Sequence, residues 1–525
     1  MTALLSVRNL SVTFGAVAAV HDVSFDIPAG ACVAIVGESG SGKSVTARTI
    51  LGLAGRDATV SGSINLDGPD LDGPDLDGTE VTDASPRRLR ALRGRDIGFV
   101  SQGALVALDP LRTVGREIAD SLRIHTNLSP RQRQQRVIEL LESVGMPEPT
   151  LRAGQRPDEL SGGLRQRAVI ASAIALNPRL LIADEPTTAL DSTITAGILD
   201  LLAGLRERGT AILLISHDLA VVSRLASHVV VMRDGVVVES GSTQQVLREP
   251  QHPYTRDLIA AVPGGHAHVG SPAGDPVVSA VGVTKRFGSR VAVDDVSYVL
   301  PRGRTLGVVG ESGSGKTTLA RLTLALERPD AGAIELFGQP WTASPERDRT
   351  ARRPRIGAIY QDALSSFDPR LTVRQILSDA LGSGATVGGR ATEAELVTLV
   401  ERVGLKATVL ARHPRVLSGG QQQRLAIARA IAPRPDIIVC DEPVSNLDVS
   451  VQAQVLTLLD GLQREFGLSY LFITHDLGVV RQVSDELLVM KDGVVVERGA
   501  TEAVFAAPQH PYTRALLAAV PDLWA

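Results

Sequence analysis

Cysteine, lysine and long apolar segments are scarce in this 525-residue chain. The two cysteines, Cys32 and Cys440, stand in short apolar runs. They are too few for a disulfide framework or for a zinc or iron–sulfur site, so we expect buried structural thiols and no iron–sulfur cluster. No segment approaches the roughly 18 apolar residues of a membrane-spanning helix, and the first residues lack the pattern of a signal peptide. We therefore expect a cytoplasmic protein whose role at a membrane would require a partner.

An excess of basic residues is also missing. The chain has 54 Lys and Arg against 58 Asp and Glu, a formal net charge of −4. A nucleic-acid-binding surface needs a strong basic excess or a basic stripe, so we expect no nucleic-acid partner. Lysine occurs only at positions 43, 285, 316, 406 and 491. Two of these lysines lie in a glycine-rich motif that occurs twice.

The chain contains a long internal repeat, and its length also indicates two or more domains. Five motifs occur twice in the same order: GESGSGKS (37–44) and GESGSGKT (310–317), LSGG (160–163 and 417–420), ADEP (183–186) and CDEP (440–443), SHDL (216–219) and THDL (474–477), and QHPYTR (251–256 and 509–514). We predict a first domain over residues 1–262, a Gly- and Pro-rich linker over 263–276 and a second domain over 277–525.

The first half has extra residues between its first two motifs. We assign them to a tandem repeat rich in Asp, Gly and Pro at 66–78. A calcium loop is the alternative, but the spacing does not match an EF-hand and no bidentate Glu follows at the required place. We expect a solvated surface insertion.

Each copy of the first motif follows a short apolar run and precedes a helical pattern. Strand, glycine-rich loop and helix in this order predict a phosphate-binding loop, because the glycines let backbone N–H groups wrap the phosphates and the helix N-terminus adds positive potential. In such a loop the lysine reaches the outer phosphates and the next hydroxyl supplies an oxygen to Mg²⁺. The candidate residues are Gly37, Ser39, Gly40, Gly42, Lys43 and Ser44 in the first half, and Gly310, Ser312, Gly313, Gly315, Lys316 and Thr317 in the second.

Two carboxylates end an apolar run in each half, at LLIADEP (180–186) and IIVCDEP (437–443). The carboxyl edge of a parallel sheet is where ligands bind in such folds. We predict that Asp184 and Asp441 hold Mg²⁺ and that Glu185 and Glu442 are general bases for the attacking water. Acidic N-caps of a following helix are the alternative, which the upstream phosphate-binding loop disfavours.

LSGGLRQR (160–167) and LSGGQQQR (417–424) precede helical patterns. A serine and two glycines there can form an N-cap or an anion site. With these segments the chain resembles the nucleotide-binding domains of ABC transporters, whose signature sequence is LSGGQ and whose other motifs follow the same order. The resemblance implies an α/β fold with two P-loop NTPase domains, each with a parallel-sheet core, an antiparallel β-subdomain and an α-helical signature subdomain.

The resemblance also implies roles for single residues. Gln102 and Gln361 match the Q-loop glutamine, which serves Mg²⁺ binding and coupling, and residues 189–191 and 446–448 match the D-loop. His217 and His475 match the switch histidine at the terminal phosphate, although a lone His after an apolar strand is usually a strand-end residue. Phe14 and Phe287 stand where the family has its adenine-stacking aromatic, with a core Phe as the alternative.

In this family ATP is sandwiched between the phosphate loop of one domain and the signature of the other, here within one polypeptide. Site one would combine 37–44, Gln102, Asp184, Glu185 and His217 with Ser418, Gly419 and Gly420. Site two would combine 310–317, Gln361, Asp441, Glu442 and His475 with Ser161, Gly162 and Gly163.

QHPYTR resembles the segment that follows the nucleotide-binding core in oligopeptide and dipeptide importer ATPases, and LSGGLRQR resembles their signature variant. The residues alone indicate only a Pro-started helix with an apolar face. The Cys-containing extension of that group is missing. Gly103 follows Gln102 where the group usually has Asp, as at Asp362, so the halves are expected to contact different membrane subunits.

The resemblance implies an ATPase at the cytoplasmic face of the cell membrane, with ATP and Mg²⁺, two permease subunits and an extracytoplasmic binding protein. Peptides or glutathione are the expected cargo, and a metal chelate or siderophore is the alternative. A ribosome-associated ATPase of the ABC-F type is disfavoured because such proteins have a long, charged linker. A DNA-repair ATPase of the excision type would need zinc-binding cysteines.

Overall fold

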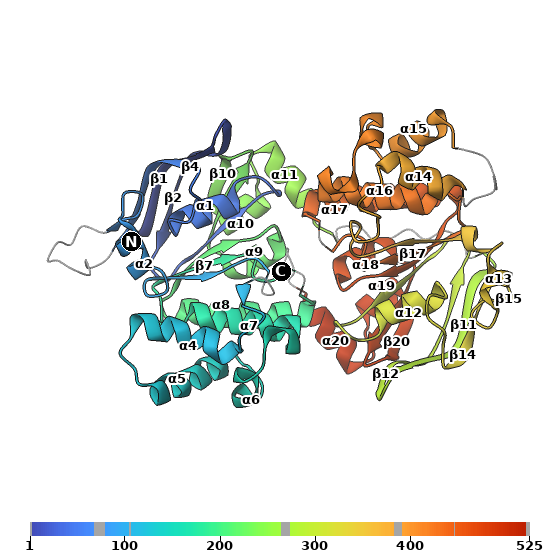
Figure 1. Cartoon of the computed structure of the whole chain (residues 1–525), viewed down its shortest axis with the longest axis horizontal. Helices are drawn as coiled ribbons and strands as arrows, with labels where there is room; N and C mark the ends of the chain where they lie inside the picture. The colour runs from blue at the N-terminus through green and yellow to red at the C-terminus, as the bar shows by residue number, and fades with distance from the viewer. Residues whose placement is uncertain are drawn as a thin grey trace. The chain divides into compact units, whose positions relative to one another are not determined.

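A computed structural model describes residues 3–67, 79–103, 107–188, 190–263, 274–382, 391–445 and 447–520. The chain forms two compact units, the first with residues up to 190 and from 194 to 260, the second with residues 191–193 and 261–520. Figure 1 shows the first in blue to green and the second in yellow-green to red. Among the described residues no helix is long and apolar enough to cross a membrane.

The first unit is built on a sheet whose described strands follow the order β10-β9-β3-β8-β7-β6. Neighbouring strands from β9 to β6 pair in parallel, and β10 is antiparallel to β9. Three central strands are buried over their full length, as expected where both faces of a parallel sheet are covered. The strands are β3 (Cys32–Val36), β6 (Ile97–Val100), β7 (Leu180–Asp184), β8 (Ala211–Ile215), β9 (His228–Arg233) and β10 (Val236–Ser242).

A second, antiparallel sheet in this unit has the order β2-β1-β4-β5. Buried residues are interspersed with less buried ones along β1, so one face of the sheet packs inward. Its buried residues and those of the parallel sheet form one apolar cluster with α1 (Lys43–Ile50). The strands are β1 (Ala3–Phe14), β2 (Val17–Pro28), β4 (Ala58–Leu66) and β5 (Thr79–Glu80).

Four helices between β6 and β7 pack against one another as a helical subdomain (Figure 1). Ser129 begins one of them with a capping box, in which its side chain and that of Gln132 each bond the other residue's backbone N–H. The four are α4 (Val114–His125), α5 (Pro130–Ser143), α6 (Pro149–Ala153) and α7 (Gly162–Ala173). The other helices are α2 (Pro86–Leu92), α8 (Ser192–Glu207), α9 (Leu219–Leu225), α10 (Thr243–Arg248) and α11 (Pro253–Ala260).

The second unit repeats this architecture, with sheets ordered β12-β11-β14-β15 and β20-β19-β13-β18-β17-β16. Its strands are β11 (Pro276–Phe287), β12 (Arg290–Pro301), β13 (Thr305–Val309), β14 (Ala331–Leu336), β15 (Gln339–Pro340), β16 (Ile356–Ile359), β17 (Ile437–Asp441), β18 (Ser469–Ile473), β19 (Glu486–Lys491) and β20 (Val494–Ala500). Its helices are α12 (Lys316–Thr323), α13 (Glu346–Arg349), α14 (Val373–Gly382), α15 (Glu393–Arg402), α16 (Gly419–Ile431), α17 (Val449–Phe466), α18 (Leu477–Val483), α19 (Thr501–Ala506) and α20 (Pro511–Ala518). The predicted fold class is confirmed in both halves.

Both cysteines are free and buried, as predicted. Burial raises the pKa of Cys32 to about 12 and also raises that of Cys440. Most of the predicted insertion at 66–78 and of the linker at 263–276 lies outside the described residues, as do Ala189 and Asn446 of the D-loop segments. The boundaries 1–262 and 277–525 stay a prediction.

Candidate active site

The first phosphate loop joins the buried strand β3 to α1. Its backbone has positive φ at Gly37 (149°) and at Gly42 (97°), a conformation that side chains rarely adopt. A Cβ at Gly37 would lie 2.1 Å from the carbonyl oxygen of Met232, and one at Gly42 would lie 2.6 Å from that of Ala19. Only glycine fits at these two places, and the close approach of β9 and β2 fixes the path of the loop.

Lys43 is buried at the start of α1, with an exposed fraction of 5%. Its Nζ donates to the carbonyl oxygens of Gly37 (2.8 Å) and Glu38 (2.7 Å). The ammonium group is thus held by the loop itself. A buried cation set among backbone amides at a helix N-terminus can bind phosphate oxygens.

The second phosphate loop has the same geometry. Lys316 Nζ donates to the carbonyl oxygens of Gly310 and Glu311, both at 2.8 Å. A Cβ at Gly310 or Gly315 would lie 2.2 Å from a backbone oxygen. Burial lowers the pKa of Lys316, and the carboxylate of Glu442 opposes that shift.

The strand-end aspartates contact the hydroxyls of the phosphate loops. Ser44 Oγ donates to Asp184 Oδ1 at 3.0 Å, and Thr317 Oγ1 donates to Asp441 Oδ1 at 3.2 Å. Burial raises the pKa of both aspartates, although these hydrogen bonds oppose the shift. The Oδ2 atom of Asp184 is buried and has no hydrogen-bond partner. A buried carboxylate oxygen beside a hydroxyl fits Mg²⁺, which takes one or two protein oxygens and completes its shell with water and phosphate.

Glu185 follows Asp184 with a left-handed backbone, φ 51°. Its N–H continues the sheet ladder by donating to the carbonyl oxygen of Ile215 at 2.9 Å. A left-handed non-glycine residue costs on the order of 1–3 kcal/mol and persists only where surrounding contacts fix it. Glu442 repeats the feature with φ 50° and a bond to the carbonyl oxygen of Ile473.

Three side chains converge on the Glu185 carboxylate. Gln102 Nε2 donates to Oε2 at 2.7 Å, Thr188 Oγ1 donates to Oε2 at 3.0 Å, and His217 Nδ1 lies 3.3 Å from Oε1. The structure therefore brings the predicted Q-loop glutamine, general base and switch histidine together. The contact of Thr188 with Glu185 was not predicted. In the sequence, only the position of Thr188 three residues after Glu185 could have indicated it.

The second half assembles the same group around Glu442. Gln361 Nε2 donates to Oε2 at 2.8 Å, and His475 Nδ1 lies 3.2 Å from Oε1. Burial alone would raise the pKa of each glutamate and lower that of each histidine. The glutamate–histidine contact outweighs burial, so the net pKa of Glu185 and Glu442 is lowered and that of His217 and His475 is raised.

The signature serines are N-caps. Ser161 Oγ accepts from Leu164 N and begins α7, while Ser418 forms a capping box with Gln421 and begins α16. A Cβ at Gly163 would meet the Ile194 side chain at 2.6 Å, and one at Gly420 would meet Val451 at 2.6 Å. The N-cap geometry is therefore present in both halves. Contact of Ser161, Gly162, Gly163, Ser418, Gly419 and Gly420 with nucleotide stays a prediction.

The two candidate adenine-stacking aromatics have different surroundings. Phe14 is half-buried and packs against the apolar cluster of its unit. Phe287 is 47% exposed, and Lys285 Nζ lies 5.5 Å from its ring centroid. A core role fits Phe14 better than Phe287, and adenine contact stays a prediction for both.

One contact to the phosphate loops was not anticipated. The hydroxyl of Tyr254 accepts a hydrogen bond from Glu38 N at 3.0 Å, and that of Tyr512 accepts one from Glu311 N at 3.0 Å. Both tyrosines belong to the repeated QHPYTR motif. Its recurrence in the two halves was the available signal, but nothing in the motif indicated the phosphate loop as its partner.

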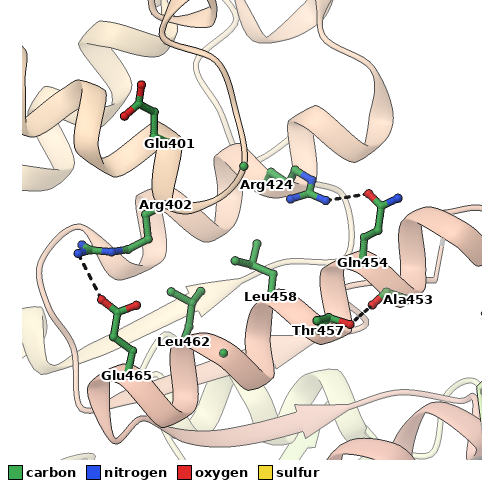
Figure 2. Close-up of a pocket in the computed structure, with 11 residues that line it drawn as sticks. Glu401, Arg402, Arg424, Ala453, Gln454, Thr457, Leu458, Leu462 and Glu465 are labelled. Carbon is green, nitrogen blue, oxygen red and sulfur yellow. Dashed lines mark hydrogen bonds and ion pairs between the residues drawn. The ribbon is translucent and has the colours of Figure 1, made fainter.

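A cavity of about 640 Å³ lies elsewhere in the second half, between the end of α15, α16 and α17 (Figure 2). Arg402 pairs with Glu465 and Arg424 bonds Gln454 along its wall. None of the predicted nucleotide-site residues lines it.

Comparison with known proteins gives matches to two families. Residues 20–188 and 293–445 match the ABC transporter family, and residues 238–276 and 496–525 match the family "Oligopeptide/dipeptide transporter, C-terminal region". The chain belongs to the ABC transporter family. It is an ATP-binding, ATP-hydrolysing member with two cassettes fused in one polypeptide.

Two relatives match almost the whole chain. The peptidoglycan transport ATP-binding protein YejF of Agrobacterium fabrum (strain C58) is 44% identical over 98% of this chain and 96% of its own length. The glutathione import ATP-binding protein GsiA of Shigella dysenteriae serotype 1 (strain Sd197) is 41% identical over 99% of this chain and 89% of its own length. The archaeal ribosome recycling factor aABCE1, solved with the stalk protein aP1, has a TM-score of 0.63 and 21% identity over 94% of this chain and 90% of its own, which shows a shared fold only.

Proposed function

We propose that this chain hydrolyses ATP to drive import of peptide-like molecules through separate permease subunits. The observation that carries this proposal is the match of both halves to the oligopeptide/dipeptide transporter C-terminal region. The names of the relatives, which refer to peptidoglycan and glutathione, agree with peptide-derived cargo. An extracytoplasmic binding protein delivers the cargo, and the chain works at the cytoplasmic face of the membrane.

The side chains divide the hydrolytic work. Lys43 and the loop amides bind the phosphates of ATP, and Ser44 and Asp184 supply oxygens for Mg²⁺, as Lys316, Thr317 and Asp441 do in the second half. Glu185, with its lowered pKa, is ionised near neutral pH and accepts a proton from the attacking water. His217 and Gln102 hold that carboxylate in place.

Both sites are proposed to be competent, because each half retains its lysine, aspartate, glutamate and histidine. Each nucleotide is proposed to be closed in by the signature of the opposite half. A structure of the chain with an ATP analogue and Mg²⁺ tests this arrangement. Contact between Ser418 and the nucleotide held by Lys43 is expected, and contact of Ser161 with that nucleotide would contradict it.

Deletion of the gene tests the cargo. Uptake of labelled di- and oligopeptides and of glutathione should be measured in the parent strain, the deletion strain and the deletion strain complemented with the parent chain or with E185Q/E442Q. We expect at least one of these uptakes to be lost and restored only by the parent chain. Normal uptake of all of them, with loss of uptake of a metal chelate or siderophore, would assign the cargo to that class and leave the ATPase intact.

A further inference from the structure

The QHPYTR motif folds into the same anchored turn in both halves. In the first half, Gln251 N and His252 N donate to the two oxygens of Glu239 on β10, at 2.8 and 3.0 Å. In the second half, Gln509 N and His510 N donate to Glu497 on β20 at 2.7 and 3.0 Å. A carboxylate that accepts two backbone N–H groups fixes both the position and the direction of the turn.

Bonds within the motif complete this turn. Tyr254 N donates to His252 Nδ1 at 3.2 Å, and the Arg256 guanidinium donates to the carbonyl oxygen of Gln251 at 2.8 Å. The second half has the equivalent bonds at 3.2 and 2.8 Å. Backbone groups of Gln251 and His252 and the side chains of His252 and Arg256 are therefore engaged in the turn and its anchor, which fixes the base from which the tyrosine extends.

The tyrosine ring extends from this base to the phosphate loop. Tyr254 is 5% exposed, with the Arg233 guanidinium 5.0 Å from its ring centroid. The Tyr512 ring has Lys491 Nζ at 5.1 Å. Burial raises the pKa of Tyr512 to about 12, so its phenol is neutral near neutral pH.

The peptide group that joins Gly37 to Glu38 is held on both sides. Its N–H, from Glu38, donates to the Tyr254 hydroxyl, and its carbonyl oxygen, from Gly37, accepts from Lys43 Nζ at 2.8 Å. The peptide group that joins Gly310 to Glu311 has the equivalent partners, Tyr512 and Lys316. A shift of this peptide would move an acceptor of the phosphate-binding lysine, so the tyrosine can influence the lysine without contact to nucleotide.

We propose that Tyr254 and Tyr512 are positioning residues for ATP binding, each of which fixes the first peptide of its phosphate loop through the N–H of Glu38 or Glu311. The repeated HPYT segment thereby sets the affinity of each half for ATP. This inference rests on the proposed function only in that the loops bind ATP.

Tyrosine-to-phenylalanine substitution in the full-length chain tests the inference. Y254F/Y512F removes two hydroxyls and keeps both rings. The loss of one hydrogen bond to each loop corresponds to about a three- to tenfold rise in KM for ATP, with a smaller change in kcat. The matched control is Y470F, which likewise removes one buried tyrosine hydroxyl, here a donor to the carbonyl oxygen of Leu459, outside the QHPYTR segment and the phosphate loop. The control should lower Tm and leave KM unchanged.

Two results would overturn the inference: a KM for Y254F/Y512F within about twofold of the parent value, or an equal rise in KM for the control, which would indicate a general effect of losing a buried tyrosine hydroxyl. Both require a parent chain with measurable ATPase activity. A parent chain that neither binds nor hydrolyses ATP would instead overturn the proposed function, and the inference with it.

Discussion

The two halves of this chain hold their candidate catalytic carboxylates with closely similar contacts. The hydroxyl–aspartate distance is 3.0 Å in the first half and 3.2 Å in the second, and the glutamine–glutamate distance is 2.7 Å and 2.8 Å. The histidine–glutamate distance is 3.3 Å and 3.2 Å. Geometry retained this closely in both copies is expected if each site must perform the same reaction.

The segments after the Q-loop glutamines differ. In the second half, Asp362 accepts from Leu364 N and Ser365 N at 3.0 and 3.2 Å, whereas Gly103 takes its place with φ 79° in the first half. Arg429 donates to the carbonyl oxygen of Ser366 at 2.6 Å, and Ser172 stands at its place in the first half. The repeat thus preserves the chemistry and changes the adjoining loop, which supports the proposal that the halves meet different membrane subunits.

Single substitutions of the two proposed general bases test whether the two halves hydrolyse ATP equally. E185Q and E442Q should each lower turnover at their own site by about 10²–10⁴-fold, because the attacking water loses its proton acceptor. If the sites act independently, steady-state ATP hydrolysis should fall to about half in either variant, and if they are coupled it should fall much further. A large loss for one variant and parent activity for the other would show that one half is inactive.

Lysine substitutions test the two phosphate loops. K43A and K316A each remove a buried ammonium, and a lost charge-assisted hydrogen bond of about 1.5–3 kcal/mol corresponds to roughly 10–100-fold weaker binding at that site. Equilibrium binding of ATP to each variant should show one weakened and one unchanged site. K406A, at one of the other lysines, is the control. Two unchanged sites in K43A would contradict the assignment of Lys43.

Arg429 allows the difference between the halves to be tested. Its guanidinium also donates to Ser366 Oγ at 3.0 Å and lies 4.7 Å from the Phe367 ring centroid. R429S introduces the residue found in the first half and should destabilise the second half by about 1–3 kcal/mol. Hydrogen exchange should increase in residues 362–371 and stay unchanged around Gln102. Equal increases in both halves would contradict a local role.

Acid should weaken the hydrogen bonds that anchor each QHPYTR turn to Glu239 or Glu497, with a smaller effect than the substitutions above. Burial would raise the pKa of Glu239. The hydrogen bonds that its carboxylate accepts, including those from the backbone N–H groups of Gln251 and His252, outweigh burial and lower the pKa below the ordinary 4.5. The pKa of Glu497 is lowered in the same way. Because the folded pKa is the lower one, this stabilisation is present above the ordinary pKa and is lost as pH falls through the folded value. The Tm difference between the parent chain and E239Q/E497Q should be larger at about pH 7 than at about pH 3. A Tm difference that is the same at both pH values would contradict a stabilising role of the ionised carboxylates.

The sequence allowed candidate catalytic residues to be named because their proposed roles depend on residue type and order along the strands. Gly37, Lys43 and Asp184 are examples whose backbone context was already visible in the pattern. The left-handed backbone of Glu185 was not predictable, since it arises from the ladder bond to Ile215. The contact between Tyr254 and Glu38 also escaped prediction, because the residues are 216 positions apart and their pairing depends on the tertiary fold.

Binding and hydrolysis of ATP by E185Q/E442Q, measured on one preparation beside the parent chain, test the central claim most directly. The account predicts that the double variant binds ATP with parent affinity, because Lys43 and Lys316 are unchanged, and that its turnover is lower by at least about 10²-fold. ATP hydrolysis by the double variant at the parent rate would contradict the assignment of Glu185 and Glu442 as general bases.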